Sequence, residues 1–210
     1  RQPWRIALSL LYQEFGEEVR SLPLDLLSTP GEPRLTNLLR MLESGFNSPL
    51  TSSCGRLFDG ISALLGIKPV IAYEAQAAIA LEMSAREGEE SLYREAAASI
   101  SSSGPIELSA LLRTITRDLL EGTDPGIIAA RFHNTLAEVF TRAAMAARKA
   151  TGINRAALSG GVFQNVLFSR KIETALRREG FEVIVHTQVP ANDGGISLGQ
   201  IAVAERMRLN

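Results

Sequence analysis

Residues 158–165, Leu-Ser-Gly-Gly-Val-Phe-Gln-Asn, have the composition of a ligand-binding turn, because a short apolar run ends there in two glycines before a predicted helix. Glycine permits positive φ and a close approach of the backbone to a ligand. The first amides of a helix have no partner within it and, with the helix dipole, they favour an anion. We therefore consider a phosphate or nucleotide site at Gly160 and Gly161. A purely structural turn fits the same residues about equally well.

A second corner of this kind follows further along the chain. The apolar run at residues 183–185 leads through residues 190–195, Pro-Ala-Asn-Asp-Gly-Gly, into another predicted helix. This corner adds a carboxylate, Asp193. Taken alone, Asp193 fits a helix cap better than a metal ligand, because aspartate is a common N-cap and a metal ion needs several ligands. Two such corners in one short α/β segment indicate a nucleotide-dependent or metal-dependent site.

The remaining candidates favour structural roles. His133 lies within a predicted helix beside its apolar stripe, and His186 follows a predicted strand, so neither has the spacing of a metal ligand pair. Cys54 precedes a predicted helix, where a thiol can be activated, but no histidine partner is evident and a packed residue is the better interpretation. Asp59 and Glu74 lie near predicted helix starts, and by themselves they suggest no more than surface positions.

The elements that position these residues are predicted from apolar spacing. Up to about residue 150 the pattern is helical, interrupted by a proline-containing loop at 22–33 and a polar break at 99–104. The expected helices cover residues 4–15, 35–42, 57–65, 74–86, 108–119 and 124–150. Asp124 and Pro125 have the types expected of an N-cap and a first helical position.

From Asn154 the pattern changes to strand, helix, strand, helix. The runs at 156–158 and 181–185 are typical of parallel strands buried on both faces, and residues 165–179 would form the crossover helix. We therefore expect a helix-rich α/β fold. Its predicted division is a mainly helical part at 1–123, followed by a long helix and a βαβα segment at 124–210.

Composition and charge argue against some classes of function. The 210 residues carry a net charge of −1, so nothing in the sequence indicates a nucleic-acid partner. No apolar run reaches the ~18 residues of a membrane span. The single cysteine fits a reducing, cytoplasmic setting. Because the sequence opens at Arg1 and at once becomes helical in pattern, we expect it to be a piece of a longer protein.

Four motifs occur together and in order: Ser53-Cys-Gly-Arg-Leu-Phe-Asp59, Tyr73-Glu-Ala-Gln-Ala-Ala78, Leu158-Ser-Gly-Gly-Val-Phe-Gln-Asn165 and Asn192-Asp-Gly-Gly-Ile-Ser-Leu-Gly-Gln200. Together they closely resemble the C-terminal carbamoyltransferase region of the HypF family, the maturation proteins of nickel–iron hydrogenases. The resemblance extends over essentially the whole chain and includes its opening, Arg1-Gln-Pro-Trp4. The region is similar, more distantly, to TsaD-type enzymes, which make threonylcarbamoyl-adenosine in tRNA, and to antibiotic O-carbamoyltransferases.

This resemblance implies the second half of an actin/Hsp70/sugar-kinase-like unit, built from ribonuclease-H-like halves with helical insertions. It also implies that upstream domains convert carbamoyl phosphate and ATP to carbamoyl-adenylate. The present region would pass the carbamoyl group to the C-terminal cysteine thiol of HypE, a step toward the cyanide ligands of the hydrogenase iron. The nucleophile would come from that partner, so no residue of this chain is expected to be catalytic.

Nucleotide-binding roles follow from the resemblance for five residues. Gly160, Gly161 and Asn165 match the motif that holds the adenylate, and we expect Asn165 to face the cleft. Asp59 matches an aspartate that contacts the ribose hydroxyls in the TsaD-type relatives. Ala75 occupies the position of a glycine that allows close backbone approach in those relatives.

A metal-binding role is implied for Asp193, and the resemblance reverses the earlier preference for a simple cap. The ion would be zinc or iron, and its remaining ligands would be a histidine pair upstream of this chain. Neither His133 nor His186 falls in that motif. With the upstream domains also outside this sequence, we expect the fragment alone to be inactive.

Two other functions are also compatible with the sequence. One is carbamoyl transfer to a hydroxyl or amine of a small molecule or to tRNA, although the net charge of −1 disfavours tRNA. The other is a non-catalytic nucleotide-binding module that docks HypE or the upstream domains.

Overall fold

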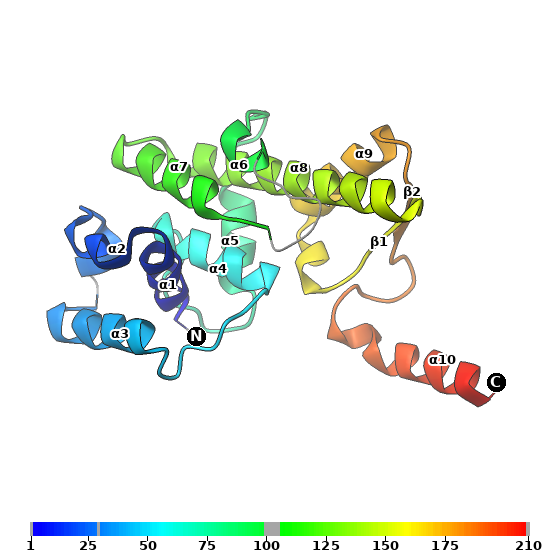
Figure 1. Ribbon diagram of the computed structural model, residues 1–210, viewed down its shortest axis with the longest axis horizontal. Coiled ribbons are helices and arrows are strands. Elements are labelled where there is room, and N and C mark those ends of the chain that lie inside the picture. Colours follow the sequence, from blue (N-terminus) through cyan, green and yellow to red (C-terminus); the bar gives the residue numbers. More distant parts are fainter. Residues whose placement is uncertain (1, 29, 99–105, 209–210) are drawn as a thin grey trace. The chain divides into compact units, whose positions relative to one another are not determined.

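The computed structural model describes residues 2–28, 30–98 and 106–208 and divides them into two compact units (Figure 1). The first unit runs to Thr135, and the second begins at Leu136. This division falls inside helix α8 (Pro125–Thr151), whereas the sequence places it just before that helix. No helix in these three ranges is both long and apolar enough to cross a bilayer.

The first unit is helical, as the apolar spacing predicts. Besides the start of α8, it contains α1 (Pro3–Phe15), η1 (Gly16–Ser21), α2 (Asp25–Ser28), α3 (Glu32–Ser44), α4 (Cys54–Leu64), α5 (Gln76–Ser84), α6 (Arg94–Ala98) and α7 (Ser109–Leu120). The predicted loop at 22–33 is partly helical. It contains α2, and Pro33 lies in the first turn of α3, where proline costs no hydrogen bond. The predicted break at 99–104 lies outside the residues that the structure describes.

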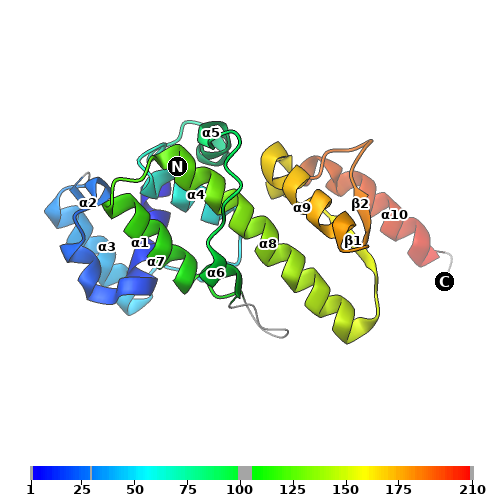
Figure 2. The same ribbon diagram turned by 90° about the horizontal axis from the view of Figure 1, so that it is seen from above.

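The core of the first unit forms where α1 lies against α4 (Figures 1 and 2). Gly60 allows this close approach, because a Cβ atom at that position would lie 2.7 Å from Leu10 Cδ1 and 3.1 Å from Ile6 Cγ2. The facing apolar side chains are almost fully buried, and they include Trp4, Ala7, Leu8, Leu11, Phe58 and Ile61. This packing fixes α4, which carries Asp59, in the interior of the unit.

Polar side chains cap the starts of α4 and α8, and the cap at Asp124 was predicted. Ser53 Oγ accepts a hydrogen bond from the Arg56 amide at the start of α4. Asp124 Oδ1 accepts from the amides of Gly126 and Ile127 at the start of α8. These caps satisfy amides that have no partner within their own helix.

The second unit contains the parallel βαβ segment that the sequence predicts. After α8 come β1 (Arg155–Leu158), η2 (Gly161–Gln164), α9 (Val166–Arg178), β2 (Glu182–Val185), η3 (Asp193–Gly195) and α10 (Ile196–Arg208). β1 and β2 pair in parallel, with Arg155 opposite Glu182 and Leu158 opposite Val185. Both Gly-Gly corners therefore follow the carboxyl ends of paired strands.

Burial of both strand faces was predicted, and the structure corrects this prediction for the described residues. α9 buries Phe168, Ile172 and Leu176, and Leu158 and Val183 are also buried. Ile184, by contrast, is 46% exposed, and α10 buries none of its residues. A parallel sheet is normally covered on both faces, whereas within the described ranges only one face of this sheet is buried.

Candidate functional site

The two Gly-Gly corners meet at the carboxyl edge of the β1–β2 sheet. The Gly160 amide donates a hydrogen bond to the Ala191 carbonyl oxygen, with the nitrogen and oxygen 2.8 Å apart. A Cβ atom on Gly161 would lie 3.9 Å from Asn192 Cβ. Ligands of open α/β sheets bind at this edge, and the structure thus brings together the segments that the sequence singled out.

Gly160 has a backbone conformation that favours glycine strongly. Its φ of 108° and ψ of 157° lie in a region that is essentially closed to other residues. Nothing lies within 4 Å of the position a Cβ atom would take, so backbone conformation rather than crowding requires glycine. The space beside the Gly160 Cα atom is therefore open.

The amides at this corner are not equally available to an anion. Because the Gly160 amide is bound to Ala191, it cannot also serve a phosphate, contrary to the expectation for a fully open corner. The amides of Gly161 and Val162 open η2 and have no acceptor among the described residues. These two amides are the ones that remain for a ligand.

Asn165 is a buried helix cap rather than a cleft-facing side chain. Its Oδ1 atom accepts a hydrogen bond of 2.7 Å from the Phe168 amide at the start of α9, and the residue is only 8% exposed. An N-cap supplies an acceptor that the first turn lacks. The cleft-facing orientation was therefore wrong for the described chain, because the same asparagine that follows the glycines also begins a helix.

Asp193 lies exposed at the first position of η3. Its neighbour Asn192 performs the capping, since Asn192 Oδ1 accepts from the Gly194 amide at 3.0 Å. The simple-cap interpretation of Asp193 is therefore wrong. Within the described ranges, no group of three or more His, Cys, Asp or Glu residues could hold a metal ion. One carboxylate does not make a metal site.

His186 was expected to be structural, and the structure gives it a specific neighbour. It follows β2 as Ser159 follows β1, and its Nε2 atom lies 3.0 Å from Ser159 Oγ. Both residues are exposed. Sequence reasoning missed the pair, because the strand register that joins these positions cannot be read from either one alone.

Asp59 is half-buried on α4 in the first unit, and its Oδ1 atom is buried without a hydrogen-bond partner. Burial raises the pKa of Asp59; a hydrogen bond from the Ala78 backbone and the charge of Arg56 act in the opposite direction, and Glu74 adds to the rise. A buried polar atom without a partner is unusual in a folded protein, and a ligand that donates a hydrogen bond would satisfy it.

Ala75 precedes α5 with φ 61° and ψ 3°, the left-handed conformation that glycine adopts most easily. For alanine this conformation costs roughly 1–2 kcal/mol. The turn is held by Gln76, whose Oε1 atom accepts from the Ala72 amide at 2.8 Å. The Ala75 backbone therefore adopts, at a steric cost, a conformation that glycine takes without one.

Asp59 and Ala75 belong to the first unit, while Gly160, Gly161, Asn165 and Asp193 belong to the second. Within each unit, one interaction connects the segments that carry these residues. In the first, the backbone of Ala78, three residues after Ala75, acts to lower the pKa of Asp59. In the second, the Gly160–Ala191 bond joins the two corners.

The structural interpretations of Cys54 and His133 are confirmed. Burial raises the pKa of the Cys54 thiol to about 11, which is the opposite of an activated cysteine. His133 is fully buried, its Nδ1 atom donates to the Ala129 carbonyl oxygen, and its ring packs against Phe58 and Phe132.

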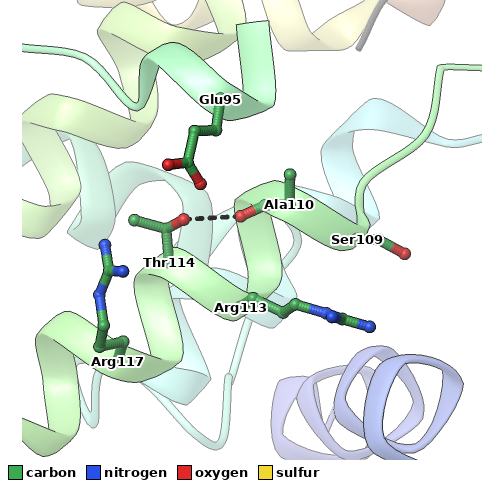
Figure 3. Close-up of a pocket in the computed structure, with 6 residues that line it drawn as sticks. All are labelled: Glu95, Ser109, Ala110, Arg113, Thr114 and Arg117. Atoms are coloured by element: carbon green, nitrogen blue, oxygen red, sulfur yellow. Dashed lines mark hydrogen bonds between the residues drawn. The ribbon is translucent and has the colours of Figure 1, made fainter. Parts of the chain in front are cut away.

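A pocket of about 460 Å³ lies on α6 and α7 (Figure 3). Six residues line it: Glu95, Ser109, Ala110, Arg113, Thr114 and Arg117. Thr114 Oγ1 donates to the Ala110 carbonyl oxygen, and Arg113 forms an ion pair with Glu14. None of the lining residues belongs to the four sequence motifs.

Comparison with known proteins places these features in a family. The family described as "Carbamoyltransferase, Kae1-like Domain, second subdomain" matches residues 1–200. Carbamoyltransferase HypF of Synechocystis sp. is 33% identical over 96% of this chain, and that of Rhizobium leguminosarum bv. viciae is 34% identical over all of it. The probable carbamoyltransferase HypF of Methanocaldococcus jannaschii is 32% identical over 95% of the chain. The chain spans about a quarter of the length of these relatives, between 26% and 27%.

Solved structures agree in fold. Full-length HypF in a phosphate- and nucleotide-bound form superposes with a TM-score of 0.86 at 33% identity, covering 99% of this chain and 32% of that one. HypF of T. kodakarensis gives a TM-score of 0.80 at 27% identity, covering 97% of this chain and 27% of that one. The helix-rich α/β fold with its small parallel sheet is therefore shared with these proteins.

Proposed function

We propose, since the chain belongs to the HypF family of carbamoyltransferases, that it forms the part of such an enzyme that holds carbamoyl-adenylate during transfer. The acceptor we propose is the C-terminal cysteine thiol of a HypE-type protein, in hydrogenase cyanide-ligand synthesis. The observation that carries the proposal is the junction of the two Gly-Gly corners at the carboxyl edge of the sheet. A similar HypF is described in a phosphate- and nucleotide-bound form, which supports a nucleotide ligand.

The phosphate of the adenylate would bind at the first corner. The amides of Gly161 and Val162 provide two donors, and Gly160 keeps the backbone in the conformation that presents them. Asn165 acts indirectly: by capping α9 it fixes the end of the turn that carries these amides. This division of roles uses one glycine for shape and the next for binding.

The nucleoside would engage Asp59 and the backbone at Ala75. The Oδ1 atom of Asp59 is a buried acceptor that costs roughly 1–3 kcal/mol while it has no donor. A ribose hydroxyl is a donor of suitable chemistry and would remove that cost on binding. Ala75 has only a methyl group at the α5 start, which leaves the backbone approachable.

A metal ion, zinc or iron, would need more than this chain supplies. The described residues contribute a single candidate ligand, Asp193, and do not by themselves fit a metal site. We therefore propose Asp193 as one ligand, with the remaining ligands contributed from elsewhere in the full-length protein.

The reaction is the attack of a thiolate on a mixed anhydride. A sulfur–carbon bond forms at the carbamoyl carbon, the bond from that carbon to the phosphate oxygen breaks, and its electron pair leaves with AMP. Negative charge returns to the phosphate as the bond breaks, so amide donors at Gly161 and Val162 stabilise the transition state. Cys54 is not needed as a nucleophile, consistent with its raised pKa.

The test is a transfer assay with the full-length protein, carbamoyl phosphate, ATP and a HypE-type acceptor, followed by intact-protein mass spectrometry. We expect a gain of one carbamoyl group on the acceptor. The matched control is an acceptor without its C-terminal cysteine, which should gain nothing. If adenylate forms and the unaltered acceptor still gains no mass, the thiol acceptor is wrong, and small-molecule or tRNA acceptors take its place.

A further inference from the structure

We infer that His186 is a positioning residue, which orients the Ser159 hydroxyl to donate to the phosphate group bound at the first Gly-Gly corner. The inference rests on the proposed function and adds two residues to it. The ligand is a nucleoside monophosphate or its carbamoyl anhydride, recognised through its phosphate. His186 acts on that ligand through Ser159.

The first support is the strand register. Leu158 and Val185 form the last pair of the parallel ladder, so Ser159 and His186 are the first residues after the two strands. Their side chains meet at the carboxyl edge, with His186 Nε2 3.0 Å from Ser159 Oγ. The pair therefore lies directly before the turn that begins at Gly160.

The second support is that the pair contributes little to holding the fold together. Both residues are exposed, and a solvent-exposed neutral hydrogen bond adds at most a small net stability. The edges of the two strands are joined instead by the backbone ladder and by the Gly160–Ala191 bond.

The third support is the chemistry of the hydroxyl group. A serine hydroxyl has one hydrogen to donate and two lone pairs. When the His186 Nε2–H donates to Ser159 Oγ, the serine hydrogen is free to point to another acceptor. An anion beside the pair favours this arrangement because the donated hydrogens then lie toward the negative charge. Open space next to Gly160 gives such an anion access.

The experiment measures AMP binding to the full-length protein by calorimetry. Ser159→Ala and His186→Ala should each weaken binding about tenfold or more, as expected for one lost hydrogen bond to a charged group. The double variant should bind no more weakly than Ser159→Ala alone, because His186 acts through the serine. His186→Gln, which keeps an N–H donor, should restore binding to within about twofold of the unaltered protein.

Gln188→Ala is the matched control, an exposed substitution next to the pair that should leave the AMP dissociation constant unchanged. Two results would overturn the inference: His186→Ala binding AMP as tightly as the unaltered protein, or single losses that multiply in the double variant. In either case, AMP binding and carbamoyl transfer by the unaltered protein would leave the proposed function standing. An unaltered protein that neither binds AMP nor transfers the carbamoyl group would overturn both.

Discussion

Asn192 Oδ1 accepts a hydrogen bond of 3.0 Å from the Gly194 amide, which leaves the adjacent Asp193 carboxylate exposed and free of the capping role. Asn192 thus stabilises the turn, and the neighbouring Asp193 is left available for the proposed metal binding. Variants at the two positions should separate those contributions.

Asp193→Ala in the full-length protein should abolish carbamoyl transfer while leaving carbamoyl-adenylate formation intact. The free energy of unfolding should change by no more than about 0.5 kcal/mol, because the substitution removes an exposed carboxylate that makes no capping hydrogen bond. Asn192→Ala is the control, and it should destabilise the 190–195 turn because it removes the acceptor of the Gly194 amide. Normal transfer by Asp193→Ala would end the ligand proposal.

Asn165→Ala should loosen α9 locally. Losing a buried N-cap costs about 1–2 kcal/mol, so amides of residues 166–169 should exchange hydrogen roughly tenfold faster or more. Asn165→Ser keeps an oxygen that can cap the helix and should retain most of the protection. Unchanged exchange in Asn165→Ala, together with weakened AMP binding, would show that the side chain contacts the nucleotide directly.

Ala75→Gly should stabilise the protein, by about 1 kcal/mol at most, because glycine adopts the left-handed conformation without the steric cost of a Cβ atom. The control has the opposite sign: Ala80→Gly, within α5, should destabilise by roughly 1 kcal/mol through lower helix propensity. Chemical denaturation of the two variants measures both changes in the free energy of unfolding. Destabilisation by both would mean that Ala75 is not strained.

Asp59→Asn should stabilise the protein at neutral pH. The folded-state pKa of Asp59 is raised above 3.8, chiefly by burial. Ionisation of this carboxyl therefore lowers the free energy of unfolding as the pH rises from 3.8 through the folded-state pKa. The neutral amide removes this cost, and the advantage of Asp59→Asn should disappear below about pH 3.8. Stability measured from about pH 4 to pH 8 should show a difference that grows with pH; one that shrinks would contradict the assignment. AMP binding by Asp59→Ala should be weaker, which tests the ribose contact separately.

The sequence predicted the long elements well because each repeats its apolar stripe over several turns. α1, α4, α7, α8 and α9 all lie where the spacing places them, and the parallel pairing of β1 with β2 follows from the βαβ order. α2 and α6 were missed because four or five residues are too few to display a helical period.

Details of the site depended on long-range contacts that a local pattern does not contain. The motifs located Gly160 and Asn165, but only the fold reveals that the Gly160 amide is bound to Ala191 and that Asn165 points into α9. Burial of both strand faces was predicted from the composition of the strands. Which face is covered depends on residues packed against it, and α9 covers only one.

Because α10 buries none of its 13 residues, it receives almost no tertiary support from the described part of the chain. Isolated helices of this length are marginal in water, so the folded fraction of residues 196–208 depends on whatever covers their apolar side chains. Hydrogen exchange in this helix therefore reports whether its apolar side chains are covered. Slow hydrogen exchange in residues 196–208 would report a covered helix, and fast exchange would report a bare one, without any label or substitution at the site itself.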